Sequence, residues 1–201
     1  MYFIGGAPRS GKSTALAALL AQRPMLAAST DSIRDVARGL ANKTDNPTLF
    51  KAGRGPLDTP KNIHAMLTKP ETIAPHHIKE SEEVWKSVST FLDCNINNER
   101  DCAVEGVAIL PKNIHEYEYE YKAVFLVNLH DQTNAMITHA RQNSHDWLNF
   151  YDENTIRAFA HFNQTLNHYY FEQAQKYDLP VVTIGKDFNL SIDEVTAILL
   201  R

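Results

Sequence analysis

Close to its start the chain reads Gly6-Ala7-Pro8-Arg9-Ser10-Gly11-Lys12-Ser13-Thr14, which fits the phosphate-binding pattern G-x-x-x-x-G-K-[ST]. Residues 2–4 before it are β-prone, and residues 13–22 after it are strong helix formers. A strand, a glycine-rich turn and a helix, in this order, are the setting in which the pattern binds phosphate. The stretch therefore predicts an α/β fold with a phosphate site at the N-terminus of its first helix.

The chemistry of this loop points to a nucleoside triphosphate. Lys12 places a positive charge near the β- and γ-phosphates, and the hydroxyl of Ser13 can ligate Mg²⁺. We therefore expect ATP and Mg²⁺ as cofactors, with Lys12 also acting in catalysis. The predicted nucleotide-binding residues are those of the whole loop: Gly6, Ala7, Pro8, Arg9, Ser10, Gly11, Lys12, Ser13 and Thr14.

Strand-like and helix-like runs alternate along the rest of the chain. The predicted strands are residues 2–5, 25–29, 101–105, 121–128 and 180–184. Several are continuous apolar runs, as expected for strands covered on both faces. The sequence thus predicts one domain over residues 1–201, a P-loop NTPase of the nucleotide-kinase-like type with a five-stranded parallel sheet flanked by helices.

A segment between the second and third strands, about residues 43–98, is too long for a simple crossover. It begins with turn-forming residues, namely Gly53, Gly55, Pro56 and Pro60, and continues with predicted helices at 61–67 and 77–97. We interpret it as an inserted helical lobe on the side of the phosphoryl acceptor.

A second connection, residues 131–157, is predicted to form a lid. A helix at 131–142 and another at 155–177 enclose a polar stretch, and Arg141 and Arg157 bracket that stretch. In small-molecule kinases, such a connection closes over the phosphates, and its arginines neutralise charge on the transferred group. Both arginines are therefore candidate catalytic residues, although solvated cations at helix ends are equally ordinary.

The helix after the second strand carries the candidate acceptor residues. It opens with Ser29-Thr30-Asp31-Ser32-Ile33-Arg34. Asp31 either caps this helix or, at the carboxyl edge of the sheet, accepts the proton of an attacking hydroxyl. Arg34 and Arg38 share one helix face and are predicted to hold an anionic acceptor.

Glu105 stands at the end of the predicted third strand. It is either the first solvated residue after that strand or an acidic group beside the phosphate loop. In the second case it holds Mg²⁺ together with Ser13, through water, or contacts the acceptor.

Three stretches, GGAPRSGKST, TDSIRDVAR and VEGVAILP, together resemble the 2-phosphoglycerate-kinase-like and zeta-toxin-like P-loop kinases. Those families carry a TD-x-IR segment and an EG-V-x-x-x-P segment in the same order. The resemblance implies ATP- and Mg²⁺-dependent phosphorylation of a small hydroxyl compound. It implies Asp31 as base, Arg34 on the acceptor and Glu105 near the metal or the acceptor. Ala108 stands where the family pattern has histidine, a departure within the acceptor pocket.

Composition limits the partners. The formal net charge of the 201 residues is −4, which favours neither nucleic acid nor an anionic membrane. The sequence has no apolar stretch of about 20 residues and no signal-peptide pattern, so a cytoplasmic protein is expected. Cys94 and Cys102 lack metal-site spacing and are predicted to be free thiols.

The predicted activity is transfer of the γ-phosphoryl group of ATP to a hydroxyl or phosphate of a small, anionic metabolite. The alternatives are a nucleoside or nucleoside monophosphate kinase, a nucleotide-dependent regulatory protein and a toxin-type kinase. The letters of a guanine-reading N-K-x-D motif occur at residues 42–45, too early in the chain for that role. By fold analogy alone, residues 185–188 are expected near the adenine ring.

Overall fold

The computed structural model of the chain describes residues 1–50 and 60–201. Its centre is a sheet of five parallel strands in the order β2-β3-β1-β4-β5. The strands are β1 (Tyr2–Gly6), β2 (Leu26–Ser29), β3 (Cys102–Gly106), β4 (Lys122–Val127) and β5 (Val181–Thr183). Each lies within a few residues of its predicted position, and the predicted fold class is confirmed.

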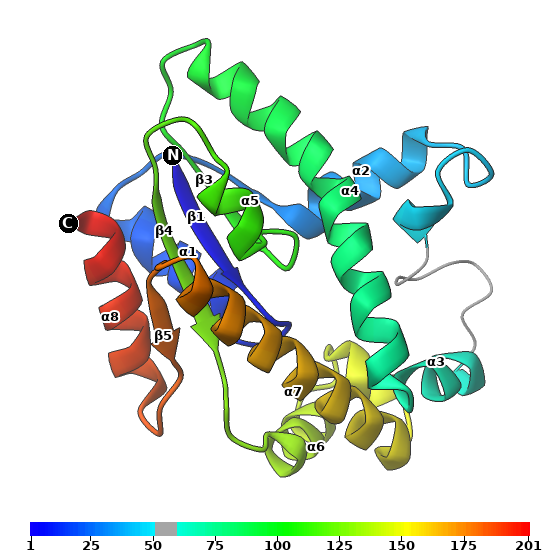
Figure 1. The fold of residues 1–201 in the computed structure, drawn as a ribbon. Helices are drawn as coiled ribbons and strands as arrows, with labels where there is room; N and C mark the ends of the chain where they lie inside the picture. The colour runs from blue at the N-terminus through cyan, green and yellow to red at the C-terminus, as the bar shows by residue number, and fades with distance from the viewer. Residues whose placement is uncertain (51–59) are drawn as a thin grey trace.

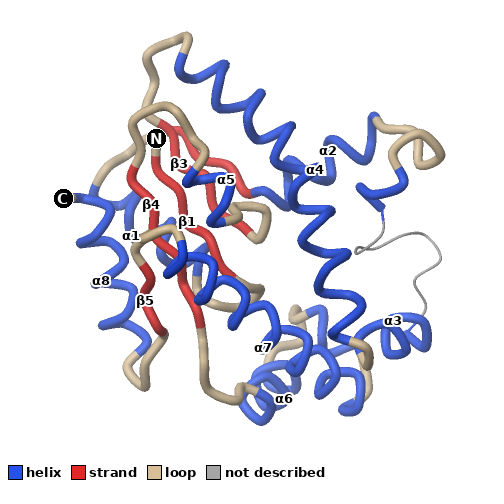
Figure 2. Tube along the Cα trace, viewed as in Figure 1, coloured by secondary structure: helices blue, strands red, loops and turns tan. Residues whose placement is uncertain are grey.

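Helices cover both faces of the sheet (Figures 1 and 2). Alternate residues of β1 show why: Phe3 packs with the helices on one face, and Ile4 packs with those on the other. The Ile4 face is covered by α1 (Lys12–Gln22) and α8 (Phe188–Leu200). The Phe3 face is covered by α4 (Pro70–Ile96), α5 (Pro111–His115) and α7 (Glu153–Lys176).

β1 lies in the middle of the sheet, with β3 on one side and β4 on the other. The first crossover leads to β2 at the edge, and β3 then fills the place between β2 and β1. Because parallel strands share one carboxyl edge, the loops after β1, β2 and β3 meet there. Both chain termini lie toward the opposite edge (Figure 1).

The inserted segment supplies a 3₁₀ turn at Pro47–Phe50, α3 (Pro60–Leu67) and the long α4. The predicted turn residues Gly53, Gly55 and Pro56 lie outside the described residues. The predicted start of the longer helix at residue 77 is wrong, because α4 begins at Pro70 and continues through Pro75. The second half of α4 is part of the core, where Val84, Val88 and Leu92 are buried.

The predicted lid, residues 131–157, comprises α6 (Thr133–Gln142), a 3₁₀ turn at Trp147–Phe150 and the start of α7. α2 (Thr30–Leu40) begins directly after β2 and packs against α4. Within the part of the chain that the structure describes, none of the helices combines the length and the apolar character needed to cross a bilayer.

Candidate active site

The phosphate loop joins β1 to α1 and carries the backbone shape that its glycines allow. Gly11, the residue before α1, has a φ of 93°, and an added Cβ would lie 2.8 Å from the ring of Phe188. No side chain of the described residues caps α1, so its first N–H groups stay open to a ligand. Such N–H groups, at the positive end of a helix, bind phosphate.

Lys12 is held inside the loop. Its Nζ donates a hydrogen bond to the carbonyl oxygen of Ala7 at 2.7 Å, and the residue is only 7% exposed. Burial lowers the pKa of Lys12 to about 8, although the nearby carboxylates of Glu105 and Asp31 oppose the shift. The ammonium group is therefore weakly solvated, and bound phosphate oxygens would be strong partners for it.

Glu105 lies next to the loop, because β3 pairs with β1 in a register that sets Glu105 opposite Ile4. The Ser13 hydroxyl donates to its Oε1 at 3.3 Å. Burial raises the pKa of Glu105, while Lys12 opposes that shift. The structure thus brings together a hydroxyl and a carboxylate, both oxygen ligands of the kind that Mg²⁺ takes.

Asp31 enters the cavity from the first turn of α2. The start of α2 packs closely on the loop after β3: Gly106 has a φ of 147°, and an added Cβ would lie 1.9 Å from Thr30 Oγ1. The helix cap is Ser29, whose Oγ accepts from the Ser32 amide at 3.1 Å. The capping interpretation of Asp31 is therefore wrong, since Asp31 lies within the helix and faces the cavity.

Arg34 and Arg38 also line the cavity, but each guanidinium already holds carboxylates. Arg34 pairs with Asp31 at 3.0 Å and with Asp35 at 3.4 Å. Arg38 pairs with the buried Glu80 at 2.5 Å and donates from Nε to the carbonyl of Leu49 at 2.8 Å. Arg38 therefore joins α2 to α4, and the hold of Arg34 and Arg38 on an anionic acceptor stays a prediction.

Arg9, in the phosphate loop, forms a salt bridge with Asp146 of the lid. The Asp146 side chain is 2% exposed, and its second oxygen lies 2.9 Å from His139 Nδ1. Arg9 has a φ of 61°, in the left-handed region that non-glycine residues adopt rarely. The ion pair thus connects the loop directly to the lid across 137 positions of sequence.

The two predicted lid arginines lie elsewhere in this structure. Arg141 donates to the carbonyl oxygens of Asn149 at 3.1 Å and Tyr151 at 2.9 Å. Arg157 pairs with Glu153, one helical turn away and exposed. Neither arginine is among the described residues that line the cavity. The structure therefore does not bring them to the phosphate loop, and Arg141 instead braces the 3₁₀ turn of the lid.

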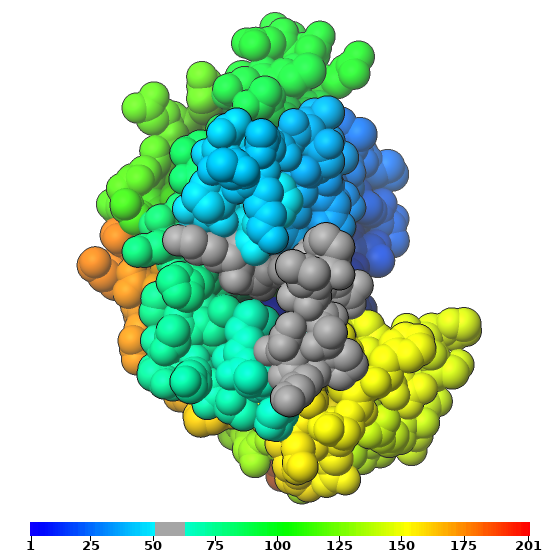
Figure 3. All heavy atoms as spheres, turned by 90° about the vertical axis from the view of Figure 1, so that its right-hand side faces the viewer, coloured from blue at the N-terminus to red at the C-terminus, as the bar shows by residue number. Residues whose placement is uncertain are grey.

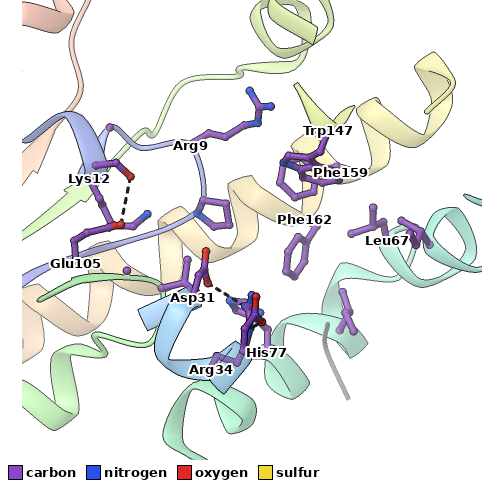
Figure 4. Close-up of a pocket in the computed structure, with 18 of the residues that line it drawn as sticks. Arg9, Lys12, Asp31, Arg34, Leu67, His77, Glu105, Trp147, Phe159 and Phe162 are labelled. Carbon is purple, nitrogen blue, oxygen red and sulfur yellow. Dashed lines mark hydrogen bonds and ion pairs between the residues drawn. The ribbon is translucent and has the colours of Figure 1, made fainter. Parts of the chain in front are cut away.

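A cavity of about 1170 Å³ joins these groups (Figures 3 and 4). The phosphate loop, Asp31 and Glu105 form its polar part. In the space-filling view, the surface is hollowed between the blue and cyan segment after β2 and the yellow lid (Figure 3). Phe188 lines the same cavity beside Gly11, and the expected contact of residues 185–188 with the adenine ring stays a prediction.

The far part of the cavity is apolar, and the sequence interpretation missed it. Figure 4 shows Trp147, Phe159, Phe162 and Leu67 on the side away from Lys12 and Glu105. We call four side chains the aromatic wall: Trp147, Tyr151, Phe159 and Phe162. A signal was present, because the predicted lid stretch contains Trp147 and Tyr151, whereas the face of α7 that carries the two phenylalanines depends on tertiary packing.

No protein-family model matches the chain, and no curated protein matches it. Solved structures of similar shape include an uncharacterized protein from Eubacterium ventriosum, at 15% identity, with 98% of this chain and 96% of that one covered and a TM-score of 0.49. Another is dephospho-CoA kinase from Campylobacter jejuni, at 12% identity, 98% and 94% coverage and a TM-score of 0.47. A third is TT1252 from Thermus thermophilus, at 15% identity, with 99% of this chain and 95% of that one covered and a TM-score of 0.49. Similarity this low leaves the activity to be inferred from the site itself.

Proposed function

We propose that the protein is an ATP- and Mg²⁺-dependent kinase that phosphorylates a hydroxyl group of a small molecule. The observation that carries this proposal is that the phosphate loop, Glu105 and Asp31 line a single cavity with room beyond the loop. Small-molecule pockets usually measure about 300–1,000 Å³, and this cavity, at about 1170 Å³, is slightly larger than that range. A nucleotide and an acceptor fit the space better than a nucleotide alone.

Ser13 and Glu105 would hold the metal ion. Their oxygens are already within 3.3 Å of each other, and the buried carboxylate would gain a cationic partner. Held by these two residues, Mg²⁺ would supply positive charge that offsets the charge of the phosphates. The loop amides and Lys12 would bind the phosphates and stabilise the charge that develops on the leaving ADP.

Asp31 is the candidate base. In the proposed reaction, the acceptor oxygen forms a bond to the γ-phosphorus as the bond from that phosphorus to the β,γ-bridging oxygen breaks. The hydroxyl proton passes to the Asp31 carboxylate, and ADP leaves. Arg34, 3.0 Å from Asp31, fixes the orientation of that carboxylate.

A regulatory nucleotide switch is the rival class. A switch requires a nucleotide site and a surface that moves, and it does not require a second ligand-binding region beside the nucleotide. Here the cavity continues past Asp31 to residues of α3, α4 and α7, including Leu67, His77 and Phe162. This continuation favours an enzyme with an acceptor.

The test measures ADP formation from MgATP with and without panels of small hydroxyl compounds. Substituting Lys12→Met should lower acceptor-dependent turnover by at least about 10²-fold, because Lys12 acts where phosphate charge accumulates. The matched control is Lys112→Met on α5, outside the cavity lining, which should leave turnover unchanged. Turnover that survives in the folded Lys12→Met protein would reject the proposal.

A further inference from the structure

The chemistry of the far part of the cavity bears on the acceptor. The aromatic wall is assembled from the lid and α7, where Trp147 meets Phe159 edge to face and Phe159 meets Phe162 at a tilt of 48°. Trp147 and Phe159 have centroids 5.1 Å apart at 84°, and Phe159 and Phe162 are 6.2 Å apart. Phe159 and Phe162 are each 6% exposed. Aliphatic side chains complete this part of the lining: Ile63, Met66, Leu67 and Ile73.

The guanidinium groups of the described lining residues already have partners. Every guanidinium among them has a carboxylate partner: Arg9 with Asp146, Arg34 with Asp31, and Arg38 with Glu80. An anionic acceptor would have to compete with these carboxylates for the guanidinium groups. At the buried pair of Arg38 with Glu80, displacing the carboxylate is costly because it strands a charge. An uncharged acceptor leaves all of them intact.

One polar atom on this side has no assigned role. His77, on α4, lines the cavity and meets Phe162 at 5.8 Å and 90°. Its Nε2 is buried without a hydrogen-bond partner among the described residues. Burial first, and Arg34 next, lower the pKa of His77 to about 4, so the ring is neutral at pH 7. A buried polar atom left unpaired is unfavourable, and a ligand group can satisfy it.

We propose that the acceptor is an uncharged alcohol whose body is an aromatic or heteroaromatic ring. The ring lies against Trp147, Phe159 and Phe162, a polar ring substituent pairs with His77 Nε2, and the hydroxyl points to Asp31. Flat rings gain specific edge and face contacts from such a wall, which aliphatic acids do not. This inference rests on the proposed kinase function and names its acceptor class.

Binding is tested without any assumption of turnover. The chain has two tryptophans, so Trp85→Phe leaves Trp147 as the single tryptophan, whose emission is excited selectively over that of the tyrosines. Nucleosides and pyridine or phenyl alcohols are titrated with a non-hydrolysable ATP analogue present. The matched ligands are the corresponding nucleoside monophosphates and glycerate. Ring alcohols should change Trp147 emission saturably, at concentrations at least tenfold lower than the anionic compounds require.

Turnover of the same compounds is measured in two phenylalanine variants. Phe162→Leu should raise the acceptor KM about 3- to 10-fold and leave the ATP KM unchanged, because it removes a ring contact far from the phosphate loop. Phe171→Leu, also on α7 but outside the cavity lining, is the control and should change neither constant.

The outcomes separate this inference from the proposed function. Preference for glycerate or a monophosphate, with Lys12-dependent turnover, overturns the ring-alcohol inference and keeps the kinase. Ring alcohols that bind at Trp147 without being phosphorylated support the acceptor site and reject the kinase chemistry. If no ring alcohol changes the Trp147 emission, the inference is overturned, even if the protein phosphorylates other compounds.

Discussion

Substituting Asp146→Asn tests whether the lid is fastened to the phosphate loop by charge. The asparagine keeps the shape and an oxygen that can accept from the Leu148 amide, as Asp146 Oδ1 does at 3.0 Å. It loses the charge that pairs with Arg9. Breaking a fully buried pair costs roughly 3–5 kcal/mol. Because the Arg9 side chain is 23% exposed and can recover some hydration, we expect about 2 kcal/mol here.

That loss predicts a melting temperature about 4–8 °C lower, since roughly 2–4 °C corresponds to 1 kcal/mol in a chain of this size. Burial raises the pKa of Asp146, but its hydrogen bonds from Arg9, the Leu148 amide and His139 outweigh burial, so the net pKa is lowered. A lowered carboxyl pKa gives stability that is present above the unfolded pKa, near 4, and is lost as the pH falls through the folded value. The variant should therefore show less acid destabilisation as the pH falls below about 4.

Calorimetry of a double-mutant cycle with Arg9→Gln gives the coupling directly. The control is Asp101→Asn, which breaks the exposed pair that Asp101 forms with Arg23 at 2.5 Å and should leave the melting temperature unchanged. A coupling free energy below about 0.3 kcal/mol between Arg9 and Asp146 would refute the reasoning, because the two substitutions would then act independently.

Three further predictions concern the site. Since Lys12 has a free-protein pKa of about 8 and bound phosphate would raise it, affinity for an ATP analogue should fall up to about tenfold per pH unit above 8. Calorimetric titrations at pH 7–9.5 measure this, and a flat profile contradicts it. Asp31→Asn should lower kcat by about 10²–10⁴-fold and leave the free energy of unfolding unchanged. Ser29→Ala, which removes the helix cap, should lower the free energy of unfolding by about 1 kcal/mol and leave kcat unchanged. A stability loss without a kcat loss in Asp31→Asn rejects Asp31 as base. Arg141→Ala should increase hydrogen exchange over residues 142–154 and Arg157→Ala should not; equal kcat losses would show that both arginines reach the phosphates.

The central elements could be predicted because their signals are local. The glycine and lysine spacing specifies the turn from β1 to α1, and continuous apolar runs specify β3 and β4 as strands buried on both faces. The prediction for the start of α4 was wrong for a local reason as well. Proline removes one backbone donor and usually ends a helix, yet here Pro70 occupies the first turn and the helix continues past Pro75.

The partners of the site arginines could not be predicted, because they depend on helix phase and on long-range contacts. Nothing local distinguishes Arg141, which binds carbonyl oxygens of the next turn, from an arginine aimed at phosphate. Arg38 and Glu80 are 42 residues apart and meet only because α2 packs on α4. The aromatic wall has the same origin, since α7 turns Phe159 and Phe162 inward only in the context of α3, α4 and the lid.

The specified and the unspecified positions of the phosphate-binding pattern make different contacts in this structure. The specified residues, Gly6, Gly11, Lys12 and Ser13, set the turn and supply the groups proposed to contact phosphate and metal. The four unspecified positions lie between the glycines, and two of them make contacts beyond the turn. Ala7 supplies the carbonyl that holds Lys12, and Arg9 reaches the lid through Asp146. The fixed letters therefore specify the turn, whereas the contact between the loop and residues 131–157 depends on Arg9, a position that the pattern leaves open.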